Sequence, residues 1–364
     1  MSESFNFYNP VRIHFGLGIL KRLPELIAGR RSILVTSPGW GRRLTEADPA
    51  FFQNFIARYD EVQPNPDLRS LARCYAAVHE HPVELIVGLG GGSVLDTCKV
   101  LAVKSGDSGF DDLIGLIKSP SLFEGRELIP MIAIPTTAGT GSEVTPWGTV
   151  WDTDSKCKYS ITRHDLWFES CICDAELTCS LPWDITLHTA LDALSHALES
   201  IWNVRANPIS TSLAISAAKT IVSTLPKMAG DLNNVALRER LLSGSLLAGL
   251  AFSQTQTSLA HAISYYLTLV KSVPHGLAAS FSLPVLAEVI LGRHDAIDFA
   301  LRNIFGFEPA VALRELFLRL EVPSKLSQFG IDSKEEILAL RTSVEKYPQA
   351  KSSLFSLDEV FKQL

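Results

Sequence analysis

Apolar residues in the first half of the chain gather in short runs, separated by stretches where they recur at helical spacing. The runs predict strands at residues 12–16, 32–36, 84–89 and 128–135. The spaced pattern predicts helices at residues 68–81 and 93–104. Strands that alternate with helices in this way favour a Rossmann-like parallel sheet with helices on both faces.

From Trp183 onward the apolar pattern is helical and strand signals are few. The predicted helices cover residues 183–204, 208–225, 234–252, 257–270, 278–291, 309–320 and 334–345. We therefore expect an α/β domain over residues 1–182, followed by an all-α domain over residues 183–364.

Composition and charge exclude several classes of protein. Among the 364 residues, 46% are hydrophobic and 20% are charged, as in a globular protein with a large core. The net charge of -6 gives no electrostatic reason to expect a nucleic-acid partner. The N-terminus lacks a signal-peptide pattern, and no apolar run approaches the roughly 18 residues of a membrane span. We expect a soluble cytoplasmic protein with no membrane partner.

The six cysteines are too sparse for a disulfide scaffold, and we expect reduced, structural thiols. They are Cys74, Cys98, Cys157, Cys171, Cys173 and Cys179. None is near the histidines discussed below, which argues against a thiolate zinc site.

Two glycine-rich loops follow predicted strands and predict a dinucleotide site. Residues 90–93 (Gly-Gly-Gly-Ser) lie between a strand and a helix, whose N-terminal N–H groups suit phosphate. Residues 135–145 follow another strand and supply several hydroxyls and two glycines. Ligands of open α/β sheets bind at this carboxyl edge. The alternative is a pair of tight turns, and the GxGxxG fingerprint is absent.

The turn after the second predicted strand bears on the choice of nucleotide. An acidic residue at this place commonly holds the ribose 2′-hydroxyl of NAD. Here the turn begins at Ser37 and contains no acid, and Arg42 and Arg43 follow. The pattern therefore favours NADPH over NADH, unless the two arginines are simply solvated.

One carboxylate and three histidines form a candidate metal site. Asp192 and His196 are four residues apart, so they share one face of the predicted helix. His261 and His275 lie in other apolar, small-residue helical segments. Oxygen and nitrogen donors of this kind suit Fe²⁺, Zn²⁺ or Mn²⁺.

Each of these histidines alone is more simply explained by packing or hydrogen bonding, and Asp192 with His196 by a pair that only supports other ligands or by a helix-capping network. An unpaired carboxylate in such apolar surroundings would be costly, which favours a metal. The other histidines show no comparable setting; they are His14, His79, His81, His164, His188 and His294.

Four motifs together resemble the iron-containing (group III) alcohol dehydrogenase family over nearly the whole chain. They are GGGSVLDTCK at 90–99, PTTAGTGSEVT at 135–145, DALSHALE at 192–199 and HAISYYLTLVKSVPHG at 261–276. The resemblance implies a nucleotide-binding domain, a helical metal-binding domain and a cleft between them. It implies the metal ligands Asp192, His196, His261 and His275. It implies the cofactor residues Gly90, Gly91, Gly92, Ser93, Asp96, Thr136, Thr137, Thr140, Ser142, Thr145 and Lys158.

The resemblance also implies a reaction. A divalent metal, with Fe²⁺ favoured, would polarise the carbonyl oxygen of a small aldehyde, and NAD(P)H would deliver hydride to its carbon. Many members carry a histidine where this chain has Tyr265, so Tyr265 is the candidate for the proton relay. Ser37 replaces the usual acidic residue, and a homodimer is common in the family.

A narrower resemblance points to the phosphonoacetaldehyde reductase (hydroxyethylphosphonate dehydrogenase) branch. It rests on Trp147, residues 150–152 and the HAISYYLT segment. A dianionic phosphonate would need cationic neighbours. The candidates are Arg163, His164 and Arg205, with Trp147 and Trp151 as aromatic cleft residues; the alternative is that they are surface or core residues.

Two other functions fit part of the pattern. A sugar-phosphate cyclase or glycerol-phosphate dehydrogenase-type enzyme would share the architecture, although a cyclase would need more basic residues between His261 and His275 than Lys271 alone. A metal-dependent hydrolase or a non-catalytic metal-binding protein would leave the glycine loops as turns.

Overall fold

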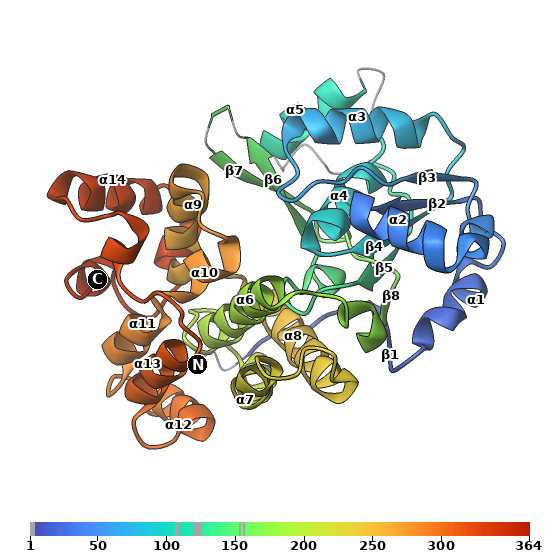
Figure 1. Ribbon diagram of the computed structural model, residues 1–364. Coiled ribbons are helices and arrows are strands. Elements are labelled where there is room, and N and C mark those ends of the chain that lie inside the picture. Colours follow the sequence, from blue (N-terminus) through green and yellow to red (C-terminus); the bar gives the residue numbers. More distant parts are fainter. Residues whose placement is uncertain (1–3, 106–108, 119–125, 153, 156) are drawn as a thin grey trace. The chain divides into compact units, whose positions relative to one another are not determined.

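The computed structural model describes residues 4–105, 109–118, 126–152, 154–155 and 157–364 (Figure 1). The chain forms two compact units. One consists of Pro10–Thr137 and Ser142–Thr178. The other consists of Met1–Asn9, Ala138–Gly141 and Cys179–Leu364. The middle of the second glycine-rich loop therefore belongs to the helical unit.

The first unit contains a parallel six-stranded sheet in the order β1-β8-β5-β4-β2-β3. Its strands are β1 (Arg12–Phe15), β2 (Ser32–Thr36), β3 (Ala57–Tyr59), β4 (Leu85–Gly90), β5 (Met131–Pro135) and β8 (Ser170–Cys173). Every residue of β2, β4, β5 and β8 is buried. Continuous apolar runs therefore predicted three of these strands correctly, because a covered parallel sheet has no solvent face.

Helices and a small hairpin complete this unit. The helices are α1 (Leu23–Ile27), α2 (Pro38–Ala47), α3 (Leu68–His79), α4 (Gly92–Ala102) and α5 (Phe110–Lys118). Strands β6 (Trp147–Asp152) and β7 (Cys157–Thr162) pair antiparallel. Strand β5 begins at Met131, later than predicted. Leu128 forms only an isolated bridge with Val103, and Pro130, which lacks a backbone N–H, precedes the strand.

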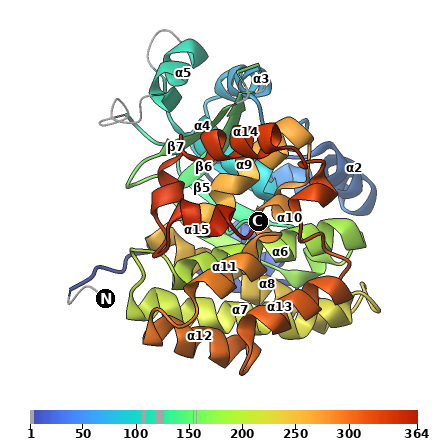
Figure 2. The ribbon, with the colours of Figure 1, turned by 90° about the vertical axis from the view of Figure 1, so that its left-hand side faces the viewer.

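The second unit is helical in the part that the structure describes (Figure 2). Its helices are α6 (Trp183–Ile201), α7 (Pro208–Met228), α8 (Val235–Thr255), α9 (Leu259–Lys271), α10 (His275–Ser280), α11 (Leu283–Ile290), α12 (Asp295–Phe305), α13 (Pro309–Arg319), α14 (Lys334–Val344) and α15 (Leu357–Phe361). The prediction of one helix over residues 278–291 was wrong. A new helix begins at Leu283 with Pro284 in its first turn, because proline fits the first turn of a helix but not the interior.

The predicted fold class is confirmed: a parallel-sheet unit is followed by a helical one. None of the helices in the described ranges is both long enough and apolar enough to cross a membrane. Helix α6 is the central element of the helical unit, because every residue from Ala190 to Ile201 is buried.

Candidate metal centre and nucleotide loops

Helix α6 holds Asp192 and His196 in the interior of the helical unit. The helix begins after Pro182, and Asp184 in its first turn complements the helix dipole. Asp192 is 4% exposed and His196 is 5% exposed. Both polar groups lie on a helix whose other buried residues are mainly Ala and Leu, so their burial needs a compensating partner.

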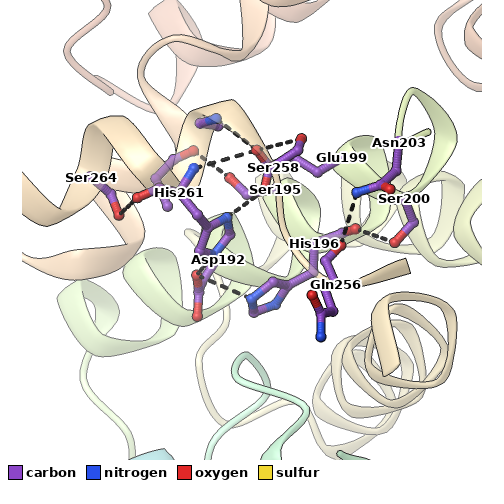
Figure 3. A network of polar contacts seen from close by, with 12 residues as sticks. Asp192, Ser195, His196, Glu199, Ser200, Asn203, Gln256, Ser258, His261 and Ser264 are labelled. Carbon is purple, nitrogen blue, oxygen red and sulfur yellow. Dashed lines mark hydrogen bonds and ion pairs between the residues drawn. The ribbon is translucent and has the colours of Figure 1, made fainter. Parts of the chain in front are cut away.

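Two further histidines converge on the same carboxylate oxygen. His261 comes from the first turn of α9, and His275 is the first residue of α10. The distance from Oδ1 of Asp192 to Nε2 is 3.4 Å for His261, 3.7 Å for His275 and 3.8 Å for His196. Figure 3 shows Asp192 and His196 on one helix with His261 facing them. All four residues predicted as ligands thus lie around Oδ1 of Asp192; Asp192, His261 and His275 form the tighter set, and His196 lies outside it.

The donor set fits a divalent cation. Ligand atoms bound at about 2.0–2.2 Å in tetrahedral geometry are about 3.3–3.6 Å apart, close to these distances. Candidate donor atoms of Asp192, His261 and His275 all lie within 4.8 Å of one another. Oδ1 of Asp192 and Nε2 of His261 are buried and have no hydrogen-bond partner among the described residues. A shared cation would satisfy both atoms.

Electrostatics keeps the carboxylate ionised and His196 neutral. Burial raises the pKa of Asp192, but His196, His275 and His261 lower it well below its usual value. Burial lowers the pKa of His196 to about 4, against the opposing effect of Asp192. A carboxylate and a neutral imidazole are the forms that bind metals.

The buried carboxylate of Glu199 orients His261, and the sequence analysis missed it. Its Oε2 lies 2.5 Å from Nδ1 of His261, and its Oε1 accepts hydrogen bonds from Ser258 Oγ (2.9 Å) and the Ala260 N–H (2.6 Å). A proton on Nδ1 leaves Nε2 free to face Asp192 (Figure 3). Glu199 lies seven residues after Asp192 and so shares its helix face; that spacing was the available signal.

The carboxylates of Glu199 and Asp192 favour the protonated form of His261. Burial lowers the pKa of His261, but the opposing effect of Glu199 and Asp192 is larger and raises the pKa to about 9. Burial also raises the pKa of Glu199, which His261 and Ser258 lower below its usual value. Glu199 is therefore ionised, and binding of a cation at Nε2 would release a proton from His261.

Aromatic packing and a close backbone contact hold His196 and the second glycine-rich loop. The His196 ring stacks on Phe252 of α8, with ring centroids 4.0 Å apart. A Cβ at Gly139 would lie 2.6 Å from Cβ of Thr189, and one at Gly141 (φ +60°) would lie 2.6 Å from Cα of Gly249. These two glycines, interpreted from sequence as nucleotide-loop residues, are needed for packing on α6 and α8, with Thr140 between them.

Tyr265 lies one helical turn after His261 on α9, and its side chain is 3% exposed. Its ring contacts Tyr347 at a centroid distance of 4.7 Å. Burial raises its pKa, which a hydrogen bond with Thr257 lowers only in part, so the phenol keeps its proton near neutral pH.

The first glycine-rich loop joins β4 directly to α4. A Cβ at Gly90 would lie 2.4 Å from Cγ2 of Val94, so the next helix can follow at once only because residue 90 has no side chain. Gly91 is the N-cap of α4, and Gly92 is its first residue. A Cβ at Gly91 would lie 3.3 Å from the Thr137 side chain, which places the two loops beside each other.

Thr136 and Ser93 also lie at this edge of the sheet, whereas Lys158 lies in the separate β6–β7 hairpin. The Thr136 N–H donates to the Gly90 carbonyl at 2.9 Å. Ser93 Oγ accepts a hydrogen bond from the Asn65 N–H at 3.1 Å. Lys158 on β7 donates to Ser160 Oγ at 2.8 Å, and burial lowers the pKa of its ammonium group to about 8.

A buried lysine that the sequence analysis passed over organises three of the predicted cofactor residues. Nζ of Lys99 donates to Ser142 Oγ (2.9 Å), Thr145 Oγ1 (3.1 Å) and the Trp147 carbonyl (2.6 Å). Ser142 Oγ in turn donates to Asp96 Oδ1 at 2.6 Å. The side chains of Asp96, Ser142 and Thr145 thus hold the loop to α4, and their contact with a nucleotide stays a prediction.

We expect Lys99→Met to raise KM for the nucleotide about three- to tenfold and to change kcat less. The variant removes a donor from two hydroxyls and one carbonyl, and each lost hydrogen bond is worth about 1 kcal/mol. Steady-state assays would give KM and kcat, and fluorescence titration would give the dissociation constant of the nucleotide. Lys104→Met removes a lysine of the exposed Lys104–Glu127 ion pair and serves as the control. Equal titrations for Lys99→Met and the parent protein would show that this loop does not contact the nucleotide.

The structure accounts otherwise for several candidates for substrate contact. Arg163 pairs with Asp165 and donates to the Arg126 carbonyl at 2.8 Å. His164 is exposed. Trp151 is 5% exposed and packs within the sheet unit. All belong to the first unit.

The structure separates Arg205 from the metal centre and places His188 one helical turn before Asp192. Arg205 is exposed and follows Ile201, the end of α6, which is about 14 Å along the helix axis from Asp192. His188, which the sequence analysis set aside, lies one turn before Asp192. A Cβ at Gly276 would lie 1.8 Å from the His188 carbonyl oxygen, so α10 packs directly against this turn. The partly exposed His188 imidazole makes no hydrogen bond within the described part of the chain.

Comparisons with known proteins agree with this geometry. The profile described as iron-containing alcohol dehydrogenase matches residues 10–175, and that of the C-terminal part of the same family matches residues 186–362. Sulfoacetaldehyde reductase of Bilophila wadsworthia is 30% identical over 354 residues, which cover 90% of this chain and 89% of that protein. 1-Propanol dehydrogenase of Salmonella typhimurium is 35% identical over 74% of this chain and 68% of that protein.

A solved structure extends the likeness to three dimensions. Sulfoacetaldehyde reductase from Bifidobacterium kashiwanohense, in complex with NAD⁺, superposes with a TM-score of 0.90 at 27% identity, covering 100% of this chain and 98% of that one. The family and the relatives named here are dehydrogenases and reductases, which favours that function over a hydrolase, a sugar-phosphate cyclase or a non-catalytic metal-binding protein. The chain belongs to the iron-containing alcohol dehydrogenase family and is an oxidoreductase.

Proposed function

We propose that this oxidoreductase uses a divalent metal and a nicotinamide nucleotide to interconvert a small aldehyde and its primary alcohol. The observation that carries the proposal is the convergence of three imidazoles on Oδ1 of Asp192, with Glu199 orienting one of them. In our proposal the metal-binding domain spans residues 183–364 and the nucleotide-binding domain spans residues 1–182. We also propose a homodimer.

The chemistry divides between the bound groups and the chain. When bound, the metal ion polarises a carbonyl oxygen and the reduced nicotinamide supplies a hydride. Asp192, His196, His261 and His275 would hold the ion, with Fe²⁺ proposed before Zn²⁺ or Mn²⁺. The balanced reaction is aldehyde + NAD(P)H + H⁺ giving primary alcohol + NAD(P)⁺.

The proton needs a donor near the metal centre. Tyr265 is proposed for this role, because it lies one turn from His261 and its raised pKa keeps the phenol protonated. His188 lies one turn from Asp192 and is partly exposed, so it is the second candidate. Either group could act directly or through a water molecule.

For the nucleotide we propose a site at the carboxyl edge of the sheet, with its phosphates at the first turn of α4. The support is the close approach of two glycine-rich loops at Gly91 and Thr137 and the N-terminus of an eleven-residue helix behind them. The relative from Bifidobacterium kashiwanohense binds NAD⁺. The neutral turn at Ser37 by itself favours NADPH. The nearby carboxylate of Asp60 favours NADH instead.

For the substrate we propose a two-carbon aldehyde that carries a strongly acidic group. Two relatives are sulfoacetaldehyde reductases, which suggests a sulfonate where the sequence motifs suggested a phosphonate. Both groups are tetrahedral anions, and the residue that we propose to donate to one is His188, which is partly exposed and lies one turn before Asp192 on α6. We therefore propose sulfoacetaldehyde before phosphonoacetaldehyde.

A panel of aldehydes tests the proposal. The protein would be reconstituted with Fe²⁺, Zn²⁺ or Mn²⁺ and assayed with NADH and NADPH on sulfoacetaldehyde, phosphonoacetaldehyde and propanal. We expect kcat/KM for an anionic aldehyde to exceed that for propanal about tenfold or more, as one charge-assisted hydrogen bond allows. Equal values would contradict the anionic substrate, and no nicotinamide oxidation with any aldehyde and metal would contradict the function itself.

A further inference from the structure

The sheet order places one segment of chain where the nucleotide's adenosine ribose would bind. Strand β4, which carries the first glycine-rich loop, pairs with β5 on one side and β2 on the other. In dinucleotide-binding sheets the acid that holds the ribose 2′-hydroxyl lies at the end of the strand next to the glycine-rich loop. Here β2 ends at Thr36, and residues 37–43 contain no acid.

An acid from the next strand lies against this turn. Asp60 follows β3, which pairs with β2 along the edge of the sheet. A Cβ at Gly41 would lie 2.7 Å from Oδ2 of Asp60 and 2.8 Å from its Cβ. Gly41 belongs to the first turns of α2, and its N–H donates to the Ser37 carbonyl at 2.9 Å. Because Gly41 has no side chain, the carboxylate of Asp60 can lie against the turn after β2, which contains no acidic residue itself.

The segment after β3 continues from this point to the glycine-rich loop. The Val62 N–H donates to the Thr36 carbonyl at 3.2 Å, and the Asn65 N–H donates to Ser93 Oγ at 3.1 Å. Residues 60–65 thus run across the carboxyl ends of β2 and β4. Asp60 lies at the end of this segment remote from the phosphate-binding turn, as an adenosine ribose would require.

The neighbouring cation does not neutralise Asp60. Nε of Arg58 lies 3.5 Å from Oδ2 of Asp60, and the two side chains are 43% and 32% exposed. An exposed pair at this distance is weak. Of the arginines that suggested a 2′-phosphate site, Arg43 covers the Trp40 ring, with its guanidinium carbon 4.7 Å from the ring centroid.

We propose that Asp60 selects NADH over NADPH. Its carboxylate accepts a hydrogen bond from the ribose 2′-hydroxyl of NADH and repels the 2′-phosphate of NADPH. The proposal rests on the proposed nucleotide site and reverses the preference expected from Ser37, Arg42 and Arg43. The acid comes from a different strand of the sheet, which is why the turn after β2 looks neutral in the sequence.

Asp60→Asn tests the charge while keeping the shape that fits against Gly41. Its control is Glu84→Gln, which removes an exposed carboxylate just before β4, at the opposite, amino end of that strand. Binding of 5′-AMP and 2′,5′-ADP to each protein would be measured by isothermal titration calorimetry, which needs neither metal nor turnover. The ratio of kcat/KM for NADPH to that for NADH would be measured in parallel, and thermal melting would check the fold.

We expect Asp60→Asn to raise affinity for 2′,5′-ADP relative to 5′-AMP, and the NADPH/NADH ratio, about tenfold or more, as removal of a close like charge should. Glu84→Gln should change either ratio less than about twofold, because β4 spans six residues, about 20 Å, and screening weakens exposed charges that far away. Unchanged ratios in Asp60→Asn, or equal shifts in both variants, would overturn the role of Asp60 while leaving the nucleotide site in place. If the parent protein binds neither nucleotide nor fragment, the proposed function and this inference both fail.

Discussion

Replacing His261 with alanine is expected to reduce metal-dependent turnover by about three orders of magnitude or more. Its Nε2 faces Oδ1 of Asp192 at 3.4 Å, and its Nδ1 is held by Glu199 at 2.5 Å. In the proposed metal site, this substitution would remove one of four candidate donors. A metal acting as a Lewis acid contributes several kcal/mol to the transition state, and each 1.36 kcal/mol is tenfold in rate.

Metal content and rate should be measured on the same samples. Inductively coupled plasma mass spectrometry after reconstitution would give the metal per chain, and steady-state assays would give kcat. His294→Ala is the matched control, because His294 is an exposed histidine of the same unit. That control should keep full metal content and activity.

The alanine variant also leaves the buried carboxylate of Glu199 without its histidine, which is expected to destabilise the fold by about 3–5 kcal/mol. His261→Gln is therefore needed as a second variant, since its amide can still donate to Glu199. Both variants should lose metal, and the glutamine variant should melt closer to the parent protein. Normal metal content and kcat in His261→Gln would remove His261 from the ligand set.

The candidate ligands were accessible from sequence because local spacing carries part of their geometry. Asp192 and His196 are one turn apart on a helix, and spacing alone predicts that they share a face. The tertiary contacts that bring α9 and α10 onto that face could not be predicted from the sequence. His275 is positioned by Gly276 against the His188 carbonyl and by the Ser195 Oγ bond to the Ala279 carbonyl at 2.7 Å.

Strand prediction shows the same limit. Buried strands β2, β4 and β5 were predicted because they are continuous apolar runs. Strand β8, with the sequence Ser-Cys-Ile-Cys, is equally buried, but its run is only four residues long and two of them, the cysteines, were interpreted only as structural thiols. Strand β3 has only three residues and an arginine, so no periodicity could show it. That short strand is what carries Asp60 to its place.

The interpretation of the glycine-rich loops needed the structure as well. Gly139 and Gly141 are required for packing on α6 and α8, as their near-contacts with Thr189 and Gly249 show. A glycine in a nucleotide-binding loop and a glycine in a tight interface are identical in sequence. Lys99 is a similar case. Its position in a predicted helix gave no sign that its ammonium group donates to three acceptors more than 40 residues away in sequence.

Replacing Glu199 with glutamine is expected to weaken metal binding by about 10- to 100-fold, the usual cost of losing the partner that orients a ligating histidine. Glutamine keeps nearly the same shape. Its amide oxygen can still accept from Ser258 Oγ and the Ala260 N–H, so its NH₂ group must then face Nδ1 of His261. An NH₂ group only donates, so Nδ1 must accept and the proton moves to Nε2, the atom that would bind the metal.

Competition with a chelator would measure the apparent dissociation constant of the metal for the parent protein, Glu199→Gln and the control Glu335→Gln. Glu335 is exposed in the first turn of α14, so its substitution should leave metal affinity unchanged. At saturating metal, Glu199→Gln should recover most of the parent kcat, because the four ligands remain. His261→Gln should not recover under the same conditions. A Glu199→Gln variant with parent-like affinity would show that the 2.5 Å contact does not set the tautomer of His261, and the metal centre would have to be built without it.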